Sequence, residues 1–229
     1  MYASARFYRS VSDINSAMTR VYSHMFLAVL TSMIVSYIVG TNAALMSFFF
    51  TGVMKWIVIF APLVFIFAVP ILLNAGIPRF GKVLTLHSFA GLMGLSLATV
   101  FAVYTMGSIV SAFMGAAVLF GTMSLYGYFT KQNLDSFGKY LLIALIAIII
   151  ASVINIFIGS SVFQMVISAI AIVVFLGFTA YDTQQIREMV SVDSDDGVEI
   201  MGAITLYLDF INLFVHLLQL FGNLKGNDD

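Results

Sequence analysis

An aspartate lies inside an apolar stretch near the end of the chain, in the sequence LYLDFINLFVHLLQLFGN that covers Leu206–Asn223. A carboxylate at bilayer depth costs roughly 2.5–3.5 kcal/mol on insertion scales, so Asp209 is expected to have a partner. The candidate is Asp182 in YDTQQI, because both acids are nearly equidistant in sequence from Asp195 and Asp196. In an antiparallel hairpin about that loop, the two carboxyl groups reach similar depths on adjacent helices.

Two carboxyl groups in one poorly hydrated site repel each other strongly when both are ionised, so the pair is expected to share one proton. Such a pair can sense pH, bind a hard cation such as Ca²⁺ transiently through the oxygens of Asp182 and Asp209, or activate water. The residue types and their spacing leave these three kinds of chemistry open.

Further polar residues recur in steps of three or four along the same segment, which places them on the helix face of Asp209. They are Thr205, Asn212, His216, Gln219 and Asn223. Such a polar stripe is expected to face the interior of the bundle, where it lines an ion path or supplies hydrogen bonds between helices. His216 fits a proton relay and a neutral interhelical hydrogen bond equally well.

The composition requires a membrane around these residues. The 229 residues are 61% hydrophobic and 9% charged, whereas soluble domains carry about 25% charged residues. The net charge of −1 gives no support for a nucleic-acid partner, and the absence of cysteine excludes disulfides and thiolate metal sites. No His–x–x–x–His pair or similar cluster indicates a bound metal or cofactor.

Seven apolar runs have about the 20 residues needed to cross a bilayer as helices. They are Tyr22–Gly40, Met54–Asn74, Leu84–Tyr104, Gly107–Thr130, Tyr140–Ile158, Val162–Tyr181 and Met201–Gly222. We therefore expect an all-α, multi-pass bundle in three parts: an N-terminal segment (1–21), one transmembrane domain (22–222) and a polar tail (223–229). Pro62 and Pro70 make the second span the one expected to kink.

Eight of the ten lysines and arginines fall on the side that holds the N-terminus. The positive-inside rule then predicts a cytoplasmic N-terminus and an outside C-terminus. The acidic loop from Asp193 to Glu199 is expected to be a solvated hairpin turn, and Gly91 and Gly94 are expected to be close helix-packing positions.

The sequences GFTAYDTQQI, GAITLYLDFINLF and MSLYGYFTKQNLDSFGKYL resemble the Bax inhibitor-type (transmembrane Bax inhibitor motif) family, and the resemblance covers nearly the whole chain. It implies a bundle of seven transmembrane helices in a bacterial inner membrane, with the C-terminal helix at the centre. It also implies a pH-sensitive calcium leak channel whose di-aspartyl sensor falls on Asp182 and Asp209. An arginine latch on the first aspartate, present in some relatives, has Arg79 as its nearest counterpart here.

Two other functions stay open beside the channel. We expect that the protein is not an enzyme. One is a membrane regulator that binds other membrane proteins or a membrane protease, as proposed for some relatives. The other is an intramembrane aspartyl protease, but such enzymes carry Gly-x-Gly-Asp where this chain has Leu206–Asp209. The expected partners of the channel are lipid, Ca²⁺ and protons.

Overall fold

A computed structural model describes residues 10–193 and 195–222, and the elements that these residues form are helices. They are α1 (Val11–Gly40), α2 (Ala43–Phe50), α3 (Met54–Asn74), α4 (Arg79–Leu97), α5 (Thr99–Val103), α6 (Met106–Phe129), α7 (Asp135–Ile158), α8 (Ser161–Val192) and α9 (Asp196–Phe221). With α4 and α5 taken together, seven spans of the described chain are long and apolar enough to cross a membrane. The expected all-helical, seven-span fold is therefore confirmed.

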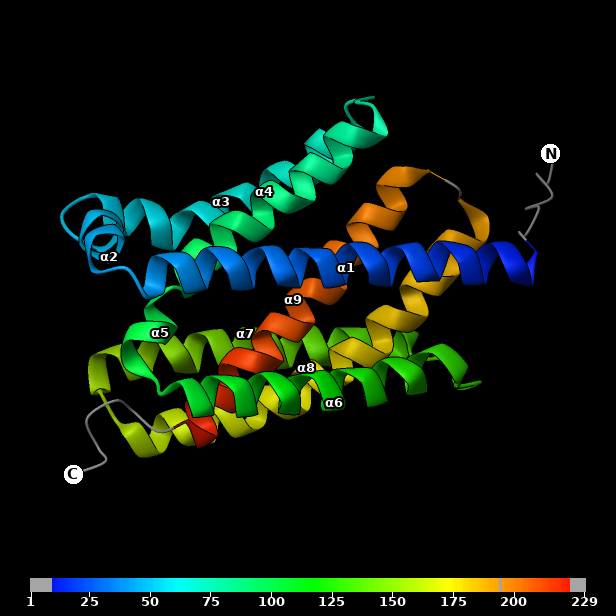
Figure 1. Cartoon of the computed structure of the whole chain (residues 1–229). Helices are drawn as coiled ribbons and strands as arrows, with labels where there is room; N and C mark the ends of the chain where they lie inside the picture. Colours follow the sequence, from blue (N-terminus) through cyan, green and yellow to red (C-terminus); the bar gives the residue numbers. More distant parts are fainter. Residues whose placement is uncertain (1–9, 194, 223–229) are drawn as a thin grey trace.

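Helix α9 occupies the centre of the bundle. It packs against α1, α3, α4, α6 and α8, and in Figure 1 it runs (orange to red) between the α3–α4 pair and the α6–α8 group. A membrane-length stretch of α9 is 67% buried, whereas the corresponding stretches of the other spans are at most 33% buried. Helix α7, which packs mainly on α8, is the most exposed. The polar C-terminal span is thus the one most protected from lipid.

The helices extend beyond the apolar runs that predict them. Helix α3 has the expected bounds, but α1 begins at Val11 and α8 continues to Val192, well past the expected Tyr181. These extensions are polar, so hydropathy does not detect them although the helix continues. The short helix α2 and the break at Ala98 between α4 and α5 were not expected.

Both prolines of α3 lie inside the helix, so each leaves the carbonyl four residues earlier without its usual N–H donor. One of these carbonyls has a hydrogen-bond donor on the neighbouring helix. Pro62 has no N–H for the carbonyl of Val58, four residues earlier. The hydroxyl of Ser96 on α4 donates to that oxygen at 2.6 Å. A polar side chain of α4 thereby satisfies the backbone defect in α3, as required in lipid.

Helices α1 and α4 approach closely at Gly94. A Cβ placed there would lie 2.5 Å from the carbonyl oxygen of Ser32, whereas a Cβ at Gly91 would meet no atom within 4 Å. The expected close-packing role is therefore correct for Gly94 and wrong for Gly91, which faces open space. Hydropathy and spacing cannot distinguish the two positions.

We expect Gly94→Ala to lower the free energy of unfolding by about 1–3 kcal/mol, because the added methyl group overlaps the backbone of α1. Gly91→Ala is the matched control and should leave stability unchanged or raise it by up to about 1 kcal/mol through helix propensity. Thermal denaturation of both variants in the same detergent measures the difference. Equal stability of the two variants would contradict the close approach.

Candidate functional site

Asp182 on α8 and Asp209 on α9 lie close enough in the described structure for their carboxyl groups to interact. Asp209 is buried, with 4% of its surface exposed, and Asp182 is partly buried. Within the described residues, one oxygen of Asp209, Oδ2, has no hydrogen-bond partner. A buried ionised oxygen without a donor is costly, so this geometry suits a pair that holds a proton between its members.

The local fold brings the two acids together through the hairpin of α8 and α9. Asp195 begins α9 as its N-cap by accepting a hydrogen bond from the N–H of Gly197 at 2.6 Å. The helices then diverge little, because Gly202 leaves room for the side chain of Ile186. A Cβ at Gly202 would lie 2.8 Å from Ile186 Cγ2. The hairpin therefore holds α8 and α9 in contact at the depth of the aspartates.

Hydroxyl groups connect the hairpin to α1 and α6, through residues of α8 and α9 that lie one or two positions from the aspartates. The hydroxyls of Tyr207 on α9 and Ser32 on α1 lie 2.6 Å apart. Thr183 on α8 contacts Ser124 on α6 at 3.0 Å, and Ser124 contacts Tyr22 on α1 at 2.6 Å. These neutral hydrogen bonds fix both helices of the pair against α1 and α6.

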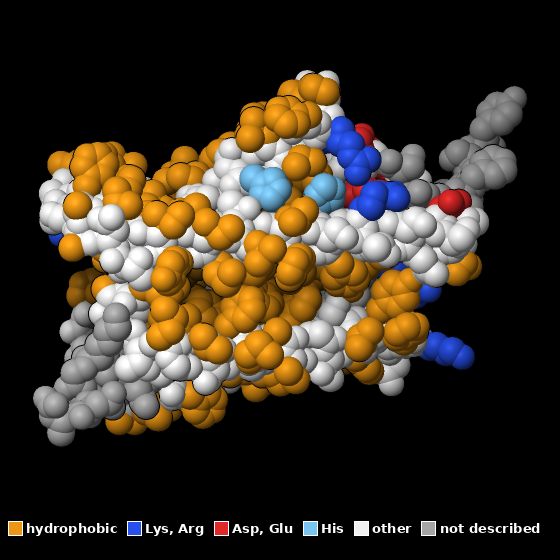
Figure 2. Space-filling model, in the orientation of Figure 1, with side chains coloured by type: hydrophobic (Ala, Val, Ile, Leu, Met, Phe, Trp, Pro, Cys, Tyr) orange, Lys and Arg blue, Asp and Glu red, His pale blue; other side chains and the backbone are white. Residues whose placement is uncertain are grey.

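Three ion pairs hold the start of α9 to α1 and α4, and we call them the ionic clamp. Arg20 of α1 makes a bidentate contact with Glu199, with Nε–Oε2 and Nη2–Oε1 distances of 2.8 and 2.5 Å. Lys82 and Arg79 of α4 contact Asp195 at 2.7 Å and Asp196 at 2.9 Å. Figure 2 shows blue and red groups gathered at this end of the molecule, hereafter the charged end.

The clamp changes the interpretation of Arg79 and of the acidic loop. Arg79 contacts Asp196, and neither aspartate of the pair contacts a lysine, arginine or histidine within the described chain. The structure thus places the candidate latch on the loop instead of on Asp182. The expectation of a solvated loop is wrong for Glu199, which is only 3% exposed. Asp195 remains exposed and Asp196 partly exposed, although each pairs with a basic residue of α4.

The remaining residues of the polar stripe have different surroundings. Thr205 and Asn212 hydrogen-bond to carbonyls of their own helix, and His216 stacks on Phe175 with an unpartnered Nδ1 among the described residues. Gln219 accepts hydrogen bonds from α8. Asn223 lies outside the described residues.

Sequence reasoning missed the polar cluster that surrounds Gln219. Gln164 and Ser168 of α8 donate to its Oε1, each at 3.0 Å, and Asn155 of α7 donates to Gln164 at 3.0 Å. This cluster joins α7, α8 and α9 far from the clamp. Amide side chains within otherwise apolar runs were the signal that could have revealed it.

A large cavity lies at the opposite end of the bundle from the clamp, between α6 and α9. Its volume is about 570 Å³, and its lining is a mixture of small polar and apolar residues. These residues include Thr105, Gly107, Ser108, Ser111, Gly115 and Leu217. We call this cavity the vestibule. None of the stripe residues that the structure describes lines it.

Comparison with known proteins identifies the fold family. The sequence profile described as "Inhibitor of apoptosis-promoting Bax1" matches residues 14–226. The chain belongs to the Bax inhibitor family. It is 40% identical to the inner membrane protein YbhL of Escherichia coli over 222 residues, which cover 93% of each chain. With its seven candidate spans, it is a multi-pass inner-membrane protein.

Other bacterial relatives span the chain equally well. It is 37% identical to the uncharacterized protein RP147 of Rickettsia prowazekii over 213 residues, which cover 90% of this chain and 89% of the relative. It is 34% identical to the uncharacterized protein YrjE of Lactococcus lactis over 228 residues, which cover 94% of each. The likeness therefore extends over most of the chain.

We expect Glu199→Gln to lower the free energy of unfolding by about 1–3 kcal/mol, because it removes the charge that holds the Arg20 guanidinium in a partly buried contact. Glu188→Gln removes an exposed acid and should change stability by less than about 0.5 kcal/mol. Denaturation of both variants in the same detergent compares them. A loss no larger than that of the control would show that the contact with Arg20 adds nothing to stability.

The contact with Lys82 predicts a pH dependence. The Lys82 ammonium, and secondarily the N–H of Gly197, lowers the pKa of Asp195. A carboxyl group whose pKa falls on folding stabilises the folded state above its unfolded pKa of about 3.9, and this stabilisation disappears as the pH falls through the lower folded value. We therefore expect Asp195→Asn to be less stable than the parent chain at pH 7, with a smaller difference at pH 3. A difference independent of pH would contradict the charge contribution.

Proposed function

We propose that this protein is a cation leak channel that passes Ca²⁺ and that protonation of Asp182 and Asp209 controls its conductance. The observation that carries the proposal is the proximity of two interacting carboxyl groups, one of them buried, with no basic partner in the described chain. A pair of this kind carries one negative charge with a shared proton and two without it. Its charge therefore changes with pH in the middle of a helix contact.

The position of the pair links that charge to the structure. Asp182 and Asp209 lie on opposite sides of the α8–α9 contact, so mutual repulsion acts along the direction that separates these helices. The clamp and the Gln219 cluster hold the hairpin at points on either side of the pair. A change in protonation would thus act between these two points, where neutral hydrogen bonds from Thr183 and Tyr207 tie α8 and α9 to α6 and α1.

The proposed ion path begins and ends at polar features of the molecule. Ca²⁺ takes six to eight oxygen ligands, and no group of three metal-binding acids or histidines occurs within the described residues. We therefore propose that the ion contacts the pair only in passing and keeps part of its water shell. The clamp, whose acids are paired with basic residues, would mark one end of the path, and the vestibule would form the mouth at the other end.

We propose the orientation that the positive-inside rule gives, with the charged end in the cytoplasm. Arg20, Arg79 and Lys82 lie at this end, and Lys55 lies at the start of α3 near the other end. The loop that joins the two helices of the sensor pair would then lie on the cytoplasmic side.

A protease is disfavoured by the surroundings of the second aspartate. Asp209 is 4% exposed on a helix that contacts five others, so a substrate strand has no room to approach it. The bulky residues Leu206–Leu208 take the place of the glycines that such enzymes use for close approach. The geometry supports ion passage better than peptide cleavage.

We expect the double variant Asp182→Asn, Asp209→Asn to lose the pH dependence of Ca²⁺ efflux, because the amide pair holds its hydrogen bond at every pH. The measurement is efflux from proteoliposomes loaded with a Ca²⁺ indicator between pH 6 and 8. Asp193→Asn, an exposed acid of the same loop, is the matched control and should keep the parent profile.

Two results would contradict the proposal in different ways. An unchanged pH profile in the folded double variant would remove the aspartates as the sensor. No efflux from the purified parent protein at any pH would remove the channel itself and favour a regulator that acts through other membrane proteins. Capture of partners after gentle solubilisation would then test that role.

A further inference from the structure

A lateral groove separates α1 from α6, although both helices pack on α9. Hydrogen bonds join the two helices toward the charged end. The hydroxyl of Tyr22 lies 2.6 Å from that of Ser124, and the hydroxyl of Tyr128 donates to Oδ1 of Asn15 at 2.5 Å. Beyond these bridges, toward the opposite end, the helices part. Figure 2 shows the resulting hollow, with hydrophobic side chains on both of its sides.

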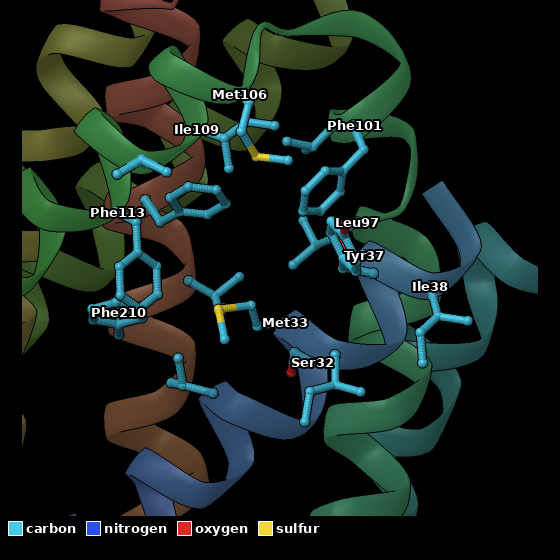
Figure 3. Close-up of a pocket in the computed structure, with 17 residues that line it drawn as sticks. Ser32, Met33, Tyr37, Ile38, Leu97, Phe101, Met106, Ile109, Phe113 and Phe210 are labelled. Atoms are coloured by element: carbon cyan, nitrogen blue, oxygen red, sulfur yellow. The ribbon is translucent and has the colours of Figure 1, made fainter. Parts of the chain in front are cut away.

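The groove has a volume of about 340 Å³, and its walls are mostly hydrophobic, with Ser32, Ser36 and Tyr37 as the polar residues of the lining. Figure 3 shows the side chains that point into it, from α1, the α4–α5 segment, α6 and α9. They include Met33, Phe101, Met106, Ile109, Phe113 and Phe210. In the aromatic floor, the ring of Phe113 packs edge-on against that of Phe210 at a centroid distance of 5.3 Å.

Water is a poor occupant of this space. The hydroxyl of Ser32, the most deeply placed polar group in the wall, already lies 2.6 Å from the hydroxyl of Tyr207 and 2.9 Å from the carbonyl of Ala90. A water molecule needs two to four polar partners, and an apolar cavity of about 150 Å³ stays dry but takes up benzene. A space more than twice that size suits a longer hydrocarbon.

The rim of the groove shows where that hydrocarbon comes from. Met33, Ile34 and Val110 are each more than 40% exposed and belong to spans whose outer surface contacts lipid. The mouth therefore opens sideways into the hydrocarbon region of the bilayer. A neighbouring helix is about 10 Å across with its side chains, so it would cover the rim and leave the space beneath it unfilled.

We propose that the groove between α1 and α6 is a binding site for one acyl chain of a membrane phospholipid. An empty groove would forfeit dispersion contacts along its walls, whereas a bound chain restores them. Met33 and Met106 at the rim have flexible, polarisable side chains that adapt to such a chain. The site is separate from the aspartate pair and independent of the proposed channel function.

Tryptophan fluorescence with brominated lipids tests this site, because the chain has a single tryptophan, Trp56, which lies on α3 outside the groove. In the Trp56→Phe background, Phe113→Trp places the reporter in the groove and Phe157→Trp places it on the lipid-facing surface of α7. Each protein is reconstituted in phosphatidylcholine vesicles with a rising fraction of lipid brominated in mid-chain. We expect quenching at both positions, with the groove reporter following the curve for about one lipid site.

A plugged groove separates a bound chain from general lipid contact. Met33→Phe with Val110→Phe enlarges two rim side chains and keeps their apolar character. In this variant we expect quenching of the Phe113→Trp reporter to fall at least twofold and that of the Phe157→Trp reporter to stay unchanged.

Three outcomes would overturn the proposal. They are a groove reporter that brominated lipid does not quench, quenching that the plug leaves unchanged, and a curve indistinguishable from that of the surface reporter. Quenching that appears only when the protein is diluted in lipid would assign the groove to a second copy of the chain instead. All these readouts are independent of ion flux, so they stand whether or not the channel proposal holds.

Discussion

The central constraint on this structure is a carboxyl group on the helix that the bundle encloses. Asp209 cannot face lipid at acceptable cost, so α9 must be surrounded by protein. Neighbouring helices supply polar groups near Asp209. Asp182 of α8 interacts with its carboxyl group, and Ser32 of α1 hydrogen-bonds to Tyr207, two residues before Asp209. The polar C-terminal helix is consequently the most buried span, whereas the thoroughly apolar α7 lies at the periphery.

The ionic clamp is the second consequence of placing α9 at the centre. The first turn of α9 carries Asp196 and Glu199, which favour the positive end of the helix dipole, but together with Asp195 they concentrate negative charge beside other helices. Cations from α1 and α4 offset that charge. Because these cations come from two helices, the clamp fixes the start of α9 in position as well as neutralising its charge.

The sequence predicted the spans and the aspartate pair for simple physical reasons. Spans follow from the length and composition that a bilayer demands, and the pair follows from the symmetry of a hairpin about its loop. The clamp could not be predicted from the sequence, because Arg20 and Glu199 are 179 residues apart and only the packing of α1 on α9 brings them together. The same holds for the contact of Ser96 with Val58 and for the break at Ala98, which depend on neighbours and leave no hydropathy signal.

The two faces of α9 connect the aspartate pair with the lateral groove. Asp209 contacts α8, whereas the next residue, Phe210, belongs to the floor of the groove between α1 and α6. A helix turns by about 100° per residue, so any rotation of α9 that moves Asp209 away from Asp182 also moves Phe210 within the groove. The ring of Phe210 packs on Phe113 and Phe120 of α6. Consecutive residues of the central helix α9 thus face two different parts of the bundle, the aspartate pair on one side and the floor of the groove on the other.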